Sequence, residues 1–195
     1  SGGITLGSVS PLIGVIDELQ GAGAGGGAGA GNDWKIIWIG TKNGPEKDLL
    51  GSLGIPFYTI GASKLRRYFS IKNLLDFFIF LFSFFQAMFY VMKFRPSCVV
   101  SAGSSISVPI HLVAKIFKIP AVIHQQDVYP GLANVVMSKT ASIITVALNS
   151  TAASFPENKT RVVGNPVRKS LFIDESGARK KLGIGQDELV ILFVG

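Results

Sequence analysis

Short apolar runs rich in β-branched residues alternate along this chain with longer stretches whose apolar residues recur at helical spacing. The apolar runs are residues 34–39, 97–101, 121–124, 142–147 and 160–163, and the helical stretches include 11–20, 107–118 and 130–140. Strands that alternate with helices in this way are typical of a parallel sheet with helices on both faces. The pattern therefore predicts an α/β domain with a parallel sheet over residues 1–162.

Residues 163–195 are predicted to form a hinge and the start of a second domain. The apolar run at 189–194 is expected to be a strand outside the first sheet. This run stops where a turn should begin, and residue 1 lies inside a glycine-rich stretch, so we interpret the sequence as a fragment of a two-domain protein. Residues 21–31, GAGAGGGAGAG, lack side chains for packing and are expected to form a flexible surface loop.

Residues 74–92, LLDFFIFLFSFFQAMFYVM, are almost wholly apolar and are flanked by basic residues. On a helix, the polar positions in and beside this segment fall on one stripe, formed by Lys72, Asp76, Ser83, Gln86, Tyr90 and Lys93. A helix of the domain core and a transmembrane helix both stay open as interpretations. The stripe favours a third, in which the polar side docks on the domain and apolar residues enter the membrane interface. The residues expected to do so are Phe77, Phe78, Phe80, Leu81, Phe84 and Phe85.

The composition is both basic and apolar, with a formal net charge of +7 and a mean hydropathy of +0.42. This combination fits an anionic membrane surface better than nucleic acid, whose binders use polar basic patches. The single cysteine, Cys98, lies in an apolar run, so we expect a buried thiol and a reducing cytoplasm. No group of Cys, His, Asp and Glu has metal-ligand spacing, so no protein-bound metal is predicted.

Two segments place polar, loop-forming residues directly after an apolar run, namely IHQQDVYPGLAN at 123–134 and VVGNPVR at 162–168. Groups at such strand ends contact ligands in α/β proteins. The segments resemble the MurG family, whose pattern reads roughly IHEQN-x-x-PGLAN and then VVGNPVR.

The resemblance implies a Rossmann-like sheet that forms the first domain of a GT-B glycosyltransferase. It also implies inverting transfer of N-acetylglucosamine from UDP-N-acetylglucosamine to lipid I, the undecaprenyl-diphosphate-linked acceptor of peptidoglycan synthesis. Such an enzyme would lie peripherally on the cytoplasmic face of the cell membrane and would need no cofactor.

A glycine-rich loop precedes the first helical stretch, and glycines there let backbone N–H groups approach phosphate oxygens. An ordinary strand–helix turn has the same appearance. The family's loop reads GGTGGH-x-x-P, and alignment on Pro11 places its six residues on Gly3, Ile4, Thr5, Leu6, Gly7 and Ser8. The resemblance assigns acceptor binding to Gly3, Gly7 and Ser8, and donor binding to Thr5. Ser8 replaces the histidine proposed as the base, and a serine hydroxyl is no base at neutral pH without a partner.

A second loop, residues 101–107, follows the run at 97–101 and resembles the family's second glycine loop, with fewer glycines. The resemblance assigns binding of the acceptor diphosphate to Gly103, Ser104 and Ser105. The alternative is a turn that caps the next helix through Ser105 or Ser107.

Within the first motif, His124 is expected to be a hydrogen-bonded structural residue, because a histidine at a strand end rarely acts as a base. Gln125 occupies the position of the family's glutamate and is assigned to the acceptor. Asp127 replaces an asparagine that contacts the substrates in the family. It is assigned to donor binding and is a second candidate base, although its charge would repel a diphosphate.

In the second motif, Gly164 permits a tight bend and Pro166 stiffens the crossing between domains. The guanidinium of Arg168 suits phosphate oxygens, and the family's matching arginine lies at the donor site. A surface salt bridge is the alternative role for Arg168.

We therefore expect an enzyme fragment that is inactive alone. One alternative is a non-catalytic subunit of a split glycosyltransferase, which would bind the lipid acceptor at the membrane. Another is a pseudoenzyme that has lost its base.

Overall fold

The computed structural model of the protein describes residues 6–25, 34–42, 44, 46–61, 72–168 and 175–191. Every strand pairing in this part of the chain is parallel, as the sequence predicted. One sheet contains β1 (Trp38–Gly40) and β2 (Phe57–Thr59). The other has the order β3-β4-β5-β6, formed by β3 (Val99–Ser101), β4 (Ala121–Gln125), β5 (Ile143–Val146) and β6 (Thr160–Val162). The described strands thus form two sheets, because no ladder joins β1 to β3.

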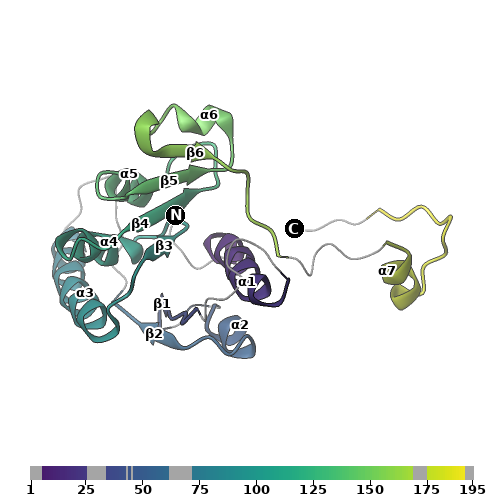
Figure 1. The fold of residues 1–195 in the computed structure, drawn as a ribbon, viewed down its shortest axis with the longest axis horizontal. Helices are drawn as coiled ribbons and strands as arrows, with labels where there is room; N and C mark the ends of the chain where they lie inside the picture. The colour runs from purple at the N-terminus through teal and green to yellow at the C-terminus, as the bar shows by residue number, and fades with distance from the viewer. Residues whose placement is uncertain are drawn as a thin grey trace.

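Helices follow most strands. They are α1 (Ser10–Gly25), α2 (Glu46–Ser52), α3 (Lys72–Phe94), α4 (Ser107–Ile116), α5 (Leu132–Ser138), α6 (Asn149–Ala152) and α7 (Glu175–Leu182), with short 3-10 turns at Leu6–Ser8 and Glu157–Lys159. Figure 1 shows α3 and α4 together on one side of the strands and α1 on the other. In the same view α7 stands apart from both sheets.

Three apolar clusters hold the helices against the strands. The largest contains Ile123 of β4 and Met137 of α5. A second contains Val91 of α3 and Val113 of α4, and a third joins α1 to α2 around Ile13. The strands of both sheets are thus packed against helices. This packing fixes the positions from which the loops emerge.

The structure corrects two expectations near the N-terminus. The helix predicted at 11–20 continues to Gly25, so residues 21–25 are helical and the rest of the expected glycine loop lies outside the described residues. Alanine favours the helix, and adding a residue to an existing helix is easier than starting one. The strand expected at 34–39 is limited to Trp38–Gly40, and Trp34 is exposed.

Two further expectations differ at other places. Cys98 is exposed rather than buried, because it precedes β3 at the open edge of the larger sheet. Leu189, Val190 and Ile191 are exposed and form no strand within the described residues, and 192–194 lie outside them. The short elements α2 and β2 were not predicted from the sequence at all.

Candidate functional site

Three polar loops leave the larger sheet at its carboxyl edge. They follow β3 at 102–105, β4 at 126–131 and β6 at 163–168. Because all strands of this sheet are parallel, the loops that follow them emerge on the same edge. This edge is where open α/β sheets bind ligands.

The loop after β3 has a strained backbone. Gly103 has φ of 90°, and Ser104 next to it has φ of 104°, a left-handed conformation that serine rarely adopts. Such a residue costs on the order of 1–3 kcal/mol and persists where the surroundings over-determine it, commonly at functional sites. The residue before α4 is Ile106, which makes no side-chain cap hydrogen bond. The alternative role of Ser105 or Ser107 as a side-chain cap therefore finds no support. The N–H groups of Ser107 and Val108 instead donate to the carbonyl oxygens of Ser104 and Ser105, at 3.2 Å and 3.3 Å.

The loop after β4 is held by its own buried amides. Gln125 Nε2 donates to the carbonyl oxygens of Asp127 at 2.9 Å and Tyr129 at 3.2 Å. Asn134 Nδ2 in turn donates to Gln125 Oε1 at 2.7 Å and to the His124 carbonyl oxygen at 3.2 Å. Gln125 is thus buried and shapes the loop, whereas the side chain of Asp127 is exposed beside it. An acceptor role for Gln125 and a donor role for Asp127 stay predictions.

His124 is hydrogen-bonded at both ring nitrogens. Nδ1 lies 3.0 Å from Thr145 Oγ1, and Nε2 lies 3.1 Å from Asn165 Oδ1. Asn165 Oδ1 can only accept a hydrogen bond, so the ring donates to it from Nε2–H. Burial lowers the pKa of His124, and the hydrogen bond to Asn165 raises it in part. The contacts favour the structural role expected from the sequence, and they tie β4 to the linker after β6.

This linker also lies against α1. A Cβ atom on Gly14 of α1 would be 3.1 Å from backbone atoms of Pro166 and Val167, so only glycine allows this close approach without a shift. Gly164 has φ of 75°, which explains the bend before the contact. Arg168 follows at once and is half-buried, and its Nε has no hydrogen-bond partner among the described residues.

The glycine-rich loop is described only in part. Gly3 and Thr5 lie outside the described residues, so their assigned roles stay predictions. Gly7 is exposed and Ser8 is half-buried in the turn Leu6–Ser8, directly before α1. The assigned roles of Gly7 and Ser8 also stay predictions.

A buried pair that the sequence did not reveal joins β3 to α4. The Oγ of Ser101 lies 2.9 Å from Nε2 of His111, and both side chains are buried. Nδ1 of His111 has no hydrogen-bond partner among the described residues, and burial lowers the pKa of His111 to about 4. The imidazole is therefore neutral at pH 7. Helical spacing gave no signal for this contact, because it depends on the register between β3 and α4.

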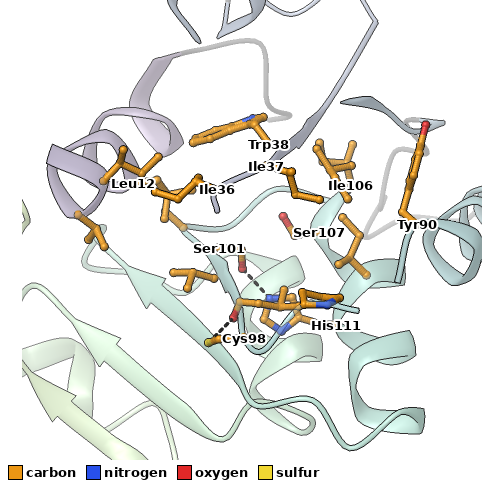
Figure 2. Close-up of a pocket in the computed structure, with 18 of the residues that line it drawn as sticks. Leu12, Ile36, Ile37, Trp38, Tyr90, Cys98, Ser101, Ile106, Ser107 and His111 are labelled. Carbon is orange, nitrogen blue, oxygen red and sulfur yellow. Dashed lines mark hydrogen bonds between the residues drawn. The ribbon is translucent and has the colours of Figure 1, made fainter. Parts of the chain in front are cut away.

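The same pair borders a cavity of about 610 Å³ between the two sheets, which we call the inter-sheet groove. Its walls are residues 34–39 with β1, residues 97–101 with β3, the apolar face of α1, and the start of α4. Figure 2 shows Leu12, Ile36 and Trp38 on one side, and Ser101, Cys98 and His111 on the opposite side.

Helix α3 docks one polar face on the end of β2, as the stripe predicted. Ser83 is fully buried, and its Oγ lies 2.8 Å from the carbonyl oxygen of Gly61. The N–H of Gly61 donates to Gln86 Oε1 at 2.9 Å, and Tyr90 donates to the carbonyl oxygen of Thr59 at 3.0 Å. These contacts satisfy the polar groups of a helix whose other face is bare.

The bare face of α3 is a continuous apolar surface, which we call the α3 patch. Its exposed residues are Phe77, Phe78, Ile79, Leu81, Phe82, Phe85, Phe89 and Met92. Of the residues expected to face a membrane, Phe80 and Phe84 instead pack against the core clusters, because they lie next to the docked stripe. Residues Asp76–Phe94 have a mean hydropathy of 1.7 over a span of 19 residues, enough by length and composition to cross a membrane. With one face docked and the other exposed, α3 is not a helix of the domain core.

Among the described residues, no group of three or more His, Cys, Asp or Glu side chains is placed to hold a metal ion. In the part of the chain that the structure describes, the carboxyl edge of the sheet offers backbone N–H groups, hydroxyls, the exposed carboxylate of Asp127 and the guanidinium of Arg168.

Residues 1–146 match the glycosyltransferase family 28 N-terminal domain. The UDP-N-acetylglucosamine--N-acetylmuramyl-(pentapeptide) pyrophosphoryl-undecaprenol N-acetylglucosamine transferase of Lachnospira eligens is 38% identical over 196 residues, which cover 100% of this chain and 52% of that protein. The protein of the same name from Clostridium tetani is 33% identical with the same coverage. The chain thus spans about half the length of the curated relatives it matches.

Among solved structures, MurG of Acinetobacter baumannii is similar with a TM-score of 0.65 and 27% identity, covering 85% of this chain and 43% of that one. Anabaena HepE in complex with UDP shares the fold with a TM-score of 0.55 at 15% identity, covering 94% of this chain and 48% of that one. The sequence match over residues 1–146 decides the family. The chain belongs to glycosyltransferase family 28, whose N-terminal domain it contains.

Proposed function

We propose that this chain is the acceptor-binding half of an inverting glycosyltransferase that moves N-acetylglucosamine from UDP-N-acetylglucosamine to lipid I. The observation that carries the proposal is the emergence of three polar loops at one edge of a parallel sheet, in a chain of glycosyltransferase family 28. Two relatives that match the whole chain are named as pyrophosphoryl-undecaprenol N-acetylglucosamine transferases.

In this reaction the 4-hydroxyl oxygen of the muramyl sugar attacks the anomeric carbon of N-acetylglucosamine. The bond from that carbon to UDP breaks, and the configuration at the carbon inverts. A base must take the hydroxyl proton, and the negative charge on the leaving diphosphate must be stabilised.

We assign the acceptor diphosphate to the loop after β3. Gly103 and Ser104 hold this loop in left-handed conformations just before α4, whose N-terminus has no side-chain cap. N–H groups at a helix N-terminus attract an anion without a positively charged side chain. Ser104 and Ser105 add hydroxyl donors, and the glycine-rich loop with Gly3 and Gly7 is the second acceptor contact in the proposal.

We assign donor contacts to Arg168, Asp127 and Thr5. Arg168 is half-buried, and its Nε has no hydrogen-bond partner among the described residues. The linker that carries it is held by the hydrogen bond of Asn165 to His124, so the guanidinium is placed to bind a phosphate oxygen. The carboxylate of Asp127 is exposed and suits a sugar hydroxyl better than a phosphate. Most donor contacts belong in this proposal to the half of the protein that the 195 residues do not include.

Two residues are candidates for the base that takes the proton of the acceptor hydroxyl. Ser8 occupies the base position of the MurG family and can orient an acceptor hydroxyl, but it needs a partner to take the proton. Asp127 is the second candidate, because its carboxylate is exposed at the end of β4.

The α3 patch supports peripheral binding to the cytoplasmic face of a membrane. Eight apolar side chains are exposed on one helix whose polar face is docked on the domain. The chain carries a formal charge of +7, which favours an anionic lipid surface. Such docking would place the acceptor loops near a lipid-linked substrate.

A transfer assay with radiolabelled UDP-N-acetylglucosamine and lipid I tests this proposal. We expect turnover by the full-length protein and none by the 195-residue chain, which should still bind lipid I. Turnover by the 195 residues would contradict the division of donor and acceptor contacts. A full-length protein that binds lipid I without turnover would instead favour a non-catalytic acceptor-binding subunit or a pseudoenzyme.

A further inference from the structure

A buried hydrogen bond spans the loop after β3, residues 102–105. Ser101 is the last residue of β3, and His111 lies within α4, so the loop connects the elements that carry the two side chains. The Oγ of Ser101 lies 2.9 Å from Nε2 of His111 (Figure 2), and the two residues are 4% and 0% exposed. The pair therefore holds the two ends of the loop together from inside the protein.

The contacts of the pair show which atom must donate. The Oγ of Ser101 also lies 3.9 Å from the sulfur of Met137, and a hydroxyl has a single hydrogen to donate. Both contacts are hydrogen bonds only if the hydroxyl donates to the sulfur and Nε2–H of His111 donates to the hydroxyl. A residue that replaces His111 must therefore carry a donor at the position of Nε2 if the contact is to be kept.

The loop that the pair spans has a backbone that needs support. Ser104 has φ of 104°, and such conformations persist only where the surroundings over-determine them. Within the described residues, the N–H groups of Gly103, Ser104 and Ser105 donate to no acceptor. Successive free N–H groups in a turn form a concave site for an anion. The conformation of this loop therefore decides whether these donors can act together.

We propose that Ser101 and His111 are positioning residues for the acceptor diphosphate, and this inference rests on the proposed function, which assigns the diphosphate to the loop after β3. Neither side chain contacts the ligand, because both are buried. Their hydrogen bond keeps Gly103 and Ser104 in the left-handed conformations that leave the N–H groups free. Without it the loop adopts other conformations as well, and binding weakens in proportion to the fraction of molecules in the competent one.

The transfer assay with the full-length protein tests the inference through two Michaelis constants. We expect Ser101→Ala and His111→Leu each to raise the KM for lipid I by about 3- to 10-fold, the range that corresponds to the loss of one hydrogen bond. The KM for UDP-N-acetylglucosamine should change by less than about twofold, because the proposed donor contacts lie outside this loop.

Three further variants separate positioning from general stability. His111→Gln should keep the wild-type KM for lipid I, because its amide nitrogen can donate to Ser101 from the position of Nε2. The double variant Ser101→Ala, His111→Leu should bind lipid I no more weakly than the weaker single variant, since both changes remove the same hydrogen bond. Val113→Ala is the matched control, because Val113 is fully buried in α4 and is not part of the pair. It should lower the Tm without raising the KM for lipid I.

Three outcomes in an active wild-type background would overturn the inference. They are an unchanged KM for lipid I in both single variants, equal rises for the two substrates, and an equal rise in Val113→Ala at the same loss of Tm. Ser101→Ala removes a single oxygen atom and keeps the comparison possible if His111→Leu does not fold. If the wild type binds lipid I without turnover, the dissociation constants of the same variants replace the KM values. A wild-type protein that binds no lipid I would contradict the proposed function itself, and the inference would fall with it.

Discussion

The imidazole Nε2 of His124 lies 3.1 Å from the side-chain oxygen of Asn165, which is 41 residues further along the chain. This contact ties the end of β4 to the linker that carries Arg168. Val163 adds a second attachment, because its N–H donates to the carbonyl oxygen of Val146 at 3.0 Å. The position of the guanidinium therefore depends on a histidine that has no direct role in the proposed chemistry.

A double-mutant cycle should show that this pair is coupled. We expect His124→Ala and Asn165→Ala each to lower the free energy of unfolding, and the double variant to lose less than the sum by about 0.5–1.5 kcal/mol. Urea denaturation of all four proteins measures the coupling. Strict additivity would mean that the contact contributes nothing to stability.

Stability should decrease in acid because of His111. Its pKa falls from 6.5 in the unfolded chain to about 4 in the folded protein, so the unfolded state binds more protons between these values. The contribution of neutral His111 to the free energy of unfolding is complete above pH 6.5 and is lost as the pH falls toward 4. We expect this loss to reach about 3 kcal/mol.

Denaturant titrations from pH 7 to pH 4 measure this effect, with His111→Gln as the control. The pKa of His124 is also lowered, so it adds to the loss in both proteins and cancels in their difference. The His111→Gln variant should have the flatter profile. Parallel profiles would show that the folded protein tolerates a charged His111.

Two glycine-to-alanine substitutions in helices should have different effects. Gly51 in α2 has open space where a Cβ would lie, so Gly51→Ala should raise the free energy of unfolding by up to about 1 kcal/mol. Gly14 in α1 faces the backbone of Pro166 and Val167, so Gly14→Ala should gain nothing or lose stability. Thermal unfolding compares the two variants. A gain at Gly14 as large as that at Gly51 would show that the linker does not press against α1.

Membrane binding should depend on the α3 patch. We expect the triple variant Phe78→Ser, Phe82→Ser, Phe85→Ser to float poorly with anionic liposomes, because it removes three exposed aromatic side chains. Ile143→Ser with Val162→Ser removes exposed apolar surface from β5 and β6 and is the control. Equal flotation of the triple variant and the control would contradict the proposed docking surface. Resistance of the wild-type protein to a carbonate wash would indicate a spanning helix instead.

Ser8→His in the full-length protein tests the position of the base. If residue 8 faces the acceptor hydroxyl, we expect the substitution to raise kcat by up to about 100-fold, because an imidazole accepts a proton near neutral pH. Ser8→Ala is the control for loss of the hydroxyl alone. An unchanged rate on Ser8→His would indicate that Asp127 is the base. The substitution Asp127→Asn then tests this role in the same assay.

The sequence by itself determined the elements with strong local signals. The runs at 121–124 and 142–147 became β4 and β5 because β-branched residues in a short apolar run fit a buried strand and little else. The polar stripe of α3 was visible for a similar reason, since helical geometry alone places Ser83, Gln86 and Tyr90 on one face. The motifs at 123–134 and 162–168 also fixed the family resemblance, because their residues and spacing are unusual.

Only the tertiary structure decided which of these residues meet. The contacts of His124 with Asn165 and of Ser101 with His111 join segments whose proximity depends on strand order and helix packing, which no local pattern encodes. Phe80 and Phe84 differ from Phe78 and Phe82 only in which neighbours surround them. The pattern therefore assigned Phe80 and Phe84 to the membrane, whereas the fold packs them, half-buried, against the core clusters. Cys98 lies in an apolar run yet is exposed, because exposure is a property of the open sheet edge and not of the run.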